Sequence, residues 1–110
     1  MKENERYLSF ELLYFDDCPS WKNALVILEK CMDNLGIFQE ISLIRIESHE
    51  DAVLNKFTGS PTIRVNGTDL FPPGQADYAL SCRVYQTPEG FQGCPTEEMV
   101  NKNLLLLLEN

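Results

Sequence analysis

The residue with the clearest chemical potential is Cys18, which stands between an apolar run and an amphipathic segment. The run Tyr7–Phe15 predicts a β-strand, and the segment Trp21–Leu35 predicts a helix. Pro19 suits the first position of that helix, which places Cys18 at or beside the N-cap. The positive end of a helix dipole and its free N–H groups favour a thiolate, so Cys18 is a candidate nucleophile.

Two carboxylates precede this cysteine and oppose its ionisation. Asp16 and Asp17 disfavour a second negative charge at Cys18, and no Lys or Arg lies within three residues on either side. We therefore expect a less acidic thiol than strong oxidants use. Asp17 itself is either a proton donor or a solvated residue of the turn.

Three further cysteines leave several interpretations open. Cys31 falls on the apolar stripe of the first helix, where a small buried residue is expected. Cys82 can resolve a disulfide with Cys18, hold a soft metal ion together with it, or lie buried in a strand and pair with Cys94. With a three-residue loop at 87–89, Cys82 lies opposite Cys94, whereas a loop longer or shorter by one residue puts them on opposite faces.

Composition narrows the class of function. The chain has 110 residues, enough for one domain, and a net charge of −8, which argues against a nucleic-acid or anionic-membrane surface. No apolar stretch reaches the ~20 residues that a membrane helix needs, and the start at 1–6 is polar and too short for a signal peptide. We therefore expect a cytoplasmic protein. There is no Cys-x-x-Cys pair and His49 is the only histidine, so no metal centre or cofactor is expected.

The remaining elements must position Cys18. They are predicted as a strand at 41–46, a helix at 49–57 capped by Ser48 and ended by Gly59, strands at 63–65 and 68–71 joined by Asn66-Gly67, and a helix after Thr96. Ser81–Tyr85 looks strand-like, and 91–94 can pair back against it. Leu104–Leu108 covers more than one helical turn, which favours a crowded core position over a homodimer patch.

This order of elements predicts an α/β fold in a single domain. A strand–helix–strand start implies a parallel pair with a right-handed crossover, and the hairpin adds antiparallel strands. We divide the domain into a core at 6–71, an insertion at 72–95 that adds strand and loop, and a C-terminal helix at 96–110.

Two motifs in this order resemble the thioredoxin superfamily, whose core runs βαβ and then αββα. Cys18-Pro19-Ser20-Trp21 matches the start of the first helix, where the superfamily carries its redox motif, and Ser60-Pro61-Thr62 matches the place of its cis-proline. The chain is also similar to small bacterial thioredoxin-like proteins that are sometimes labelled alkylmercury lyase. That likeness is carried by 14–19, 59–62 and 80–85.

The resemblance implies a monothiol site. Cys18 matches the attacking cysteine, while Trp21 occupies the position of the resolving one, as in a glutaredoxin-like motif that begins Cys-Pro. Pro61 is expected to be cis and to pack against Cys18, with the Ser60 backbone free to pair with an extended peptide or thiol substrate. The candidate residues are Cys18 and Cys82 for catalysis, and Ser60, Pro61, Trp21 and Asp17 for substrate binding.

Three functions remain open at this point. The first is thiol-disulfide redox or sulfur chemistry through Cys18, on a small molecule or a protein that carries a thiol or disulfide. The second is the handling of a soft metal or organomercurial by Cys18 and Cys82. The third is a non-catalytic interaction domain, which loss of the second motif cysteine also fits.

Overall fold

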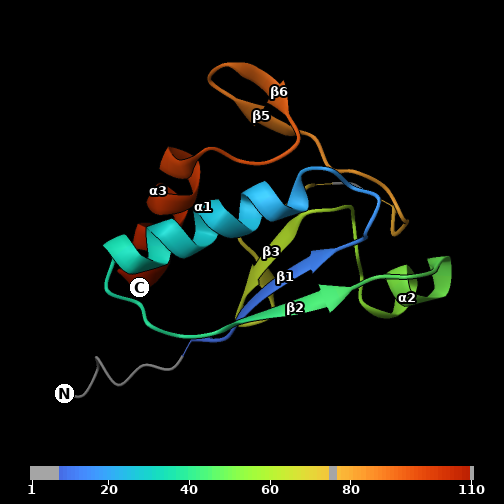
Figure 1. Ribbon diagram of the computed structural model, residues 1–110, viewed down its shortest axis with the longest axis horizontal. Coiled ribbons are helices and arrows are strands. Elements are labelled where there is room, and N and C mark those ends of the chain that lie inside the picture. Colours follow the sequence, from blue (N-terminus) through green and yellow to red (C-terminus); the bar gives the residue numbers. More distant parts are fainter. Residues whose placement is uncertain (1–7, 75–76, 110) are drawn as a thin grey trace.

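A four-stranded sheet and three helices form the framework of the computed structural model, which describes residues 8–74 and 77–109 (Figure 1). The elements are β1 (Phe10–Tyr14), α1 (Trp21–Asn34), β2 (Ile41–Arg45), α2 (His49–Leu54), β3 (Thr62–Val65), β4 (Thr68–Asp69), β5 (Tyr85–Thr87), β6 (Gly90–Gln92) and α3 (Glu97–Leu108). The sheet order is β2-β1-β3-β4, with β1 and β2 parallel and the other neighbours antiparallel. The predicted α/β class, with its parallel start and hairpin, is confirmed.

Strand β1 lies in the interior of the sheet because it is apolar on both faces. Phe10 and Leu12 join a core cluster with residues of α1, β3 and α3, and Figure 1 shows both helices on that side of the sheet. Leu13 faces the other way and packs with Ile46 and Phe57 beside α2. Full burial of an aliphatic or aromatic side chain stabilises the fold by roughly 1.5–3 kcal/mol. These residues therefore fix β1, and with it the turn that carries Cys18.

Local signals set the ends of several elements. Ser48 caps α2 by accepting a hydrogen bond from the Asp51 N–H, and the Asp51 carboxylate accepts from the Glu47 N–H. Asn66 and Gly67 both have positive φ, as a two-residue hairpin turn requires. The predicted end of α2 is wrong, because the helix stops at Leu54 rather than running to 57.

Helix α3 begins as predicted, since Thr96 accepts a hydrogen bond from the Met99 N–H. Leu104 is buried in the main core, and Leu107 and Leu108 pack against it. Leu105 and Leu106 are exposed. The leucine run therefore serves the core with three of its side chains. None of the helices in 8–74 and 77–109 is long and apolar enough to cross a membrane.

The insertion contains the β5–β6 hairpin, whose register differs from the expectation. Tyr85 pairs with Gln92 and Thr87 pairs with Gly90. The loop between these strands therefore has two residues. The Thr87 hydroxyl stabilises this short loop, because it donates to the Gly90 carbonyl and accepts from the Glu89 N–H. The three-residue loop that would place Cys82 opposite Cys94 is wrong. Figure 1 shows the hairpin standing beyond the helices, away from the sheet.

Candidate functional site

Cys18 lies in the turn between β1 and α1, slightly before the predicted position. Ser20 is the N-cap and Trp21 the first helical residue, so both Pro19 and Cys18 precede the helix. The Cys18 N–H donates to the Phe15 carbonyl at 3.1 Å and closes a turn, so the helix begins only after this turn. Because the dipole effect falls off within the first turn, α1 acts on this thiol more weakly than a cap position implies.

The Cys18 thiol is buried against the start of β3. Its side chain is 3% exposed, and Sγ donates a hydrogen bond to the Ser60 carbonyl at 3.4 Å. The Ser60–Pro61 peptide bond is cis, as the resemblance implies, and both residues are buried. Residues from β1–α1 and from the approach to β3 thus meet at one point.

A segment from the insertion lies along this point. We call residues 81–85 the strap. The Ser60 N–H donates to the Ser81 carbonyl at 2.7 Å, and the Arg83 N–H donates to the Ser60 carbonyl at 2.8 Å. Ser60 and Cys82 form a parallel β-bridge. The Ser60 backbone, which the resemblance leaves free for a substrate, is therefore paired with the strap.

The strap brings Cys82 to Cys18. The pKa of the Cys82 thiol is raised, mainly by local desolvation and further by a hydrogen bond and a charge interaction with Cys18. Cys82 is exposed and free, and Cys94 is a separate buried free thiol that accepts a hydrogen bond from Asn23 Nδ2 at 3.3 Å. The buried-strand interpretation of Cys82, with a bond to Cys94, is wrong because Cys82 is exposed and both cysteines are free.

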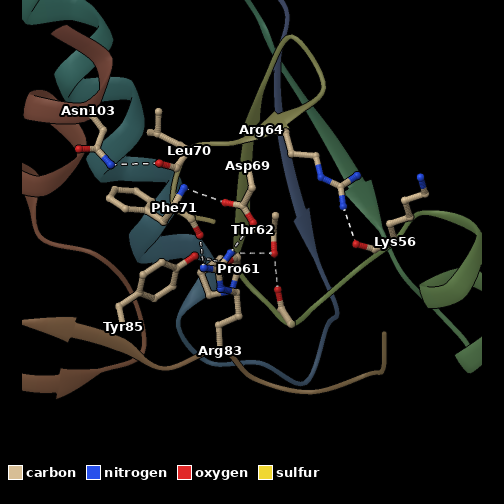
Figure 2. Close-up of polar contacts among 11 residues, drawn as sticks. Lys56, Pro61, Thr62, Arg64, Asp69, Leu70, Phe71, Arg83, Tyr85 and Asn103 are labelled. Atoms are coloured by element: carbon tan, nitrogen blue, oxygen red, sulfur yellow. Dashed lines mark hydrogen bonds and ion pairs between the residues drawn. The ribbon is translucent and has the colours of Figure 1, made fainter. Parts of the chain in front are cut away.

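Arg83 anchors the strap, as Figure 2 shows. Its buried guanidinium donates to Asp69 Oδ2 at 2.8 Å and to the Phe71 carbonyl at 2.6 Å. It also lies over the Tyr85 ring, 4.5 Å from the centroid. Burial raises the pKa of Asp69, although the charge of Arg83 partly offsets this effect. The ion pair therefore ties the strap to β4 and the chain that follows it.

Tyr85 provides a second anchor at the cis-proline. Its hydroxyl donates to the Pro61 carbonyl, and its ring meets Phe71 edge to face (Figure 2). Burial raises the pKa of Tyr85 well above its ordinary value. Gly59 allows the close approach, because it has φ of +132° and a Cβ there would lie 2.5 Å from Arg83 Cγ. The strap therefore packs directly against the turn that contains the cis-proline.

The acidic and aromatic candidates beside Cys18 lie in different surroundings. Trp21 stacks on Tyr14 with ring centroids 4.0 Å apart and packs against the core, so it anchors α1. Asp17 is exposed. Asp16 forms an exposed ion pair of 2.8 Å with Arg45 at the end of β2. That cation is distant in sequence, which is why the motif alone does not reveal it.

Sequence reasoning missed the roles of Arg83 and Tyr85. The structure buries Arg83, Tyr85 and Thr87 and exposes Cys82, Val84 and Gln86, which is the period of a strand with one face covered. The alternation in the sequence predicts the opposite face, because Cys82 and Val84 are apolar and Arg83 is charged. No local signal therefore pointed to Arg83 as the buried residue.

Comparisons with models of known families, with curated proteins and with solved structures found no match. The assignment of this chain to a class of protein and to a function therefore depends on the geometry above.

Proposed function

We propose that this chain is a thioredoxin-like protein that carries out thiol–disulfide exchange with Cys18 and Cys82. The strand order β2-β1-β3-β4, with its single parallel pair, supports this fold assignment. So does the position of Cys18 before α1 and against the residue that precedes β3. The observation that carries the function is that both cysteines meet at Ser60, because Cys18 Sγ donates to the Ser60 carbonyl and Cys82 forms a β-bridge with Ser60.

In this proposal the strap supplies the thiol that the helix motif lacks. Trp21 stands where a second motif cysteine would be, so Cys18 has no partner within its own helix. Cys82 reaches it from the insertion instead. Exchange begins when a thiolate attacks a disulfide and forms a mixed disulfide. A second protein thiol then displaces the remaining half of the substrate, which leaves Cys18 and Cys82 joined.

The experiment is a single turnover of the reduced protein with excess hydroxyethyl disulfide, followed by counting of the released mercaptoethanol. The wild type is expected to release two small thiols per chain and to retain no adduct. Cys18→Ser and Cys82→Ser are each expected to release at most one, because no partner displaces the second half. Cys31→Ser is the matched control and is expected to behave like the wild type, since Cys31 is buried and contacts Glu97. A wild type that releases none contradicts the proposal and favours a non-catalytic interaction domain.

A second candidate function rests on the same pair. Two neighbouring thiolates suit a soft ion such as Cu(I) or Hg(II). Within 8–74 and 77–109 there is no group of three or more His, Cys, Asp or Glu side chains placed to hold a metal, so the site would be two-coordinate. Competition with a Cu(I) chelator tests this candidate. Both Cys18→Ser and Cys82→Ser should weaken binding while Cys94→Ser should not, and binding unchanged in both variants contradicts it.

A further inference from the structure

The two thiols of the site differ in their access to solvent. Cys18 is 3% exposed and donates its hydrogen bond inward to Ser60, whereas Cys82 lies on the open face of the strap. We infer that Cys82 is the thiol that meets the substrate, that Cys18 completes the exchange from beneath it, and that the substrate is a small-molecule disulfide rather than an extended peptide. This inference deepens the proposed thiol–disulfide function and rests on it.

The order of attack follows from access. A disulfide must present one sulfur to the attacking thiolate, so the substrate must reach that thiolate. Only Cys82 of the two offers such a sulfur at the surface. Attack by Cys82 on the substrate R–S–S–R forms Cys82–S–S–R and releases RS⁻. Cys18 then attacks the Cys82 sulfur, forms the Cys18–Cys82 disulfide and releases the second RS⁻. The two protons lost by the cysteines end on the two released thiolates, and the substrate disulfide takes up both electrons.

The substrate class follows from the backbone of Ser60. Its N–H and its carbonyl are both paired with the strap, so an extended peptide cannot use them while the strap is in place. Displacing the strap would break the buried ion pair of Arg83 with Asp69 and the hydrogen bond from Tyr85 to Pro61. A small disulfide needs neither backbone group. It needs only to reach Cys82.

The order of attack is tested by trapping the first adduct. Each single variant, Cys18→Ser and Cys82→Ser, is mixed with hydroxyethyl disulfide at mildly alkaline pH, and the modified cysteine is located by peptide mass mapping. Because the disulfide can reach the exposed Cys82 but not the buried Cys18, we expect the adduct on Cys82 to form about tenfold or more faster than any adduct on Cys18. Cys94→Ser serves as the control and should show the wild-type rate of initial attack.

An adduct on Cys18 in Cys82→Ser at an equal or higher rate overturns the inference. That result leaves the proposed function standing if the wild type still forms the Cys18–Cys82 disulfide. A wild type that forms no such disulfide contradicts the proposed function itself. The two failures are therefore distinguishable.

The substrate class is tested by comparing hydroxyethyl disulfide with a disulfide-linked pair of extended peptides at equal concentration. The thiols of the wild type are expected to oxidise faster with the small disulfide than with the peptide disulfide. Arg83→Ala is expected to reduce this difference in rate, because loss of the anchor frees the backbone N–H and carbonyl of Ser60. Arg64→Ala is the matched control, because the guanidinium of Arg64 donates its hydrogen bond to the Lys56 carbonyl rather than to the strap (Figure 2). If Arg83→Ala fails to fold, Tyr85→Phe replaces it, because that variant loosens the strap by a smaller change. A wild type that prefers the peptide overturns this part of the inference.

Discussion

The core at 8–71 and the strap at 81–85 are held in place by different kinds of contact. The core is a sheet covered by apolar side chains that recur with strand and helix periodicity. The strap forms a single β-bridge to the core and depends on Arg83, Tyr85 and a close approach to Gly59. This difference indicates that the position of Cys82 beside Cys18 depends on a few polar contacts, those of Arg83 and Tyr85. Changes at these anchors should affect exchange more than equally destabilising changes elsewhere.

The largest expected effect is that of Arg83→Ala. Removing one partner of a buried ion pair leaves the other charge unpaired, which destabilises a protein by about 3–5 kcal/mol. Asp69 is the partner left behind, and its side chain is only 15% exposed. Urea unfolding measures the free energy of unfolding of each variant. Arg64→Ala is the matched control and is expected to lower that free energy by less than about 1 kcal/mol. Equal effects of the two variants would show that Arg83 is no anchor.

A somewhat smaller effect is expected for Gly59→Ala. A side chain at φ of +132° costs about 1–3 kcal/mol in strain, and the approach of Arg83 adds a steric cost. Gly90→Ala is the matched control, because Gly90 also has positive φ but nothing lies within 4 Å of its added Cβ. The thermal midpoint should fall more for Gly59→Ala than for Gly90→Ala. A similar fall in both would mean that the strap does not press on Gly59.

Tyr85→Phe comes next and carries a pH dependence. Loss of the hydrogen bond to Pro61 is expected to cost about 1–2 kcal/mol at neutral pH. Because burial raises the folded-state pKa of Tyr85, its stabilisation is complete below the ordinary tyrosine pKa of about 10 and is lost as pH rises above that value. The difference in unfolding free energy between wild type and Tyr85→Phe should therefore shrink above about pH 10. A difference that stays constant or grows there contradicts the buried position of the hydroxyl.

The smallest effect is expected in the core, at the cap of α2. Ser48→Ala removes the acceptor for the Asp51 N–H and should cost about 1 kcal/mol. It should leave the rate of exchange with hydroxyethyl disulfide unchanged, because α2 does not hold the strap. A clear fall in the exchange rate of Ser48→Ala would mean that core stability, rather than the anchors, governs the reaction.

The same division explains how much the sequence could predict. Periodicity placed β1, α1 and β2, and local side-chain signals at Ser48, Asn66-Gly67 and Thr96 marked caps and a turn. The path of the insertion depends on contacts that bridge distant residues, such as Arg83 with Asp69. The register of its hairpin depends on the Thr87 hydroxyl, which selects a two-residue loop. The path of the insertion therefore follows from tertiary geometry, whereas the hairpin register follows from hydrogen bonds within residues 87–90.

The candidate site divides in the same way. The resemblance noted above implied that Cys18 lies beside a cis-proline turn, and Cys18 does contact Ser60, which precedes the cis Pro61. The partner of Cys82 was left open between Cys18 and Cys94, because one residue of loop length reverses the face of a strand. The occupation of the Ser60 backbone by the strap was not predicted. Nothing within residues 18–21 or 60–62 indicates it.

The most direct measurement of the central claim is the disulfide linkage of the oxidised protein. The reduced chain is treated with a slight excess of hydroxyethyl disulfide, the remaining thiols are alkylated, and the peptides are mapped without reduction. We expect a single new disulfide between Cys18 and Cys82, with Cys31 and Cys94 recovered as alkylated thiols. A link between Cys82 and Cys94, or recovery of all four cysteines as alkylated thiols, would contradict this expectation.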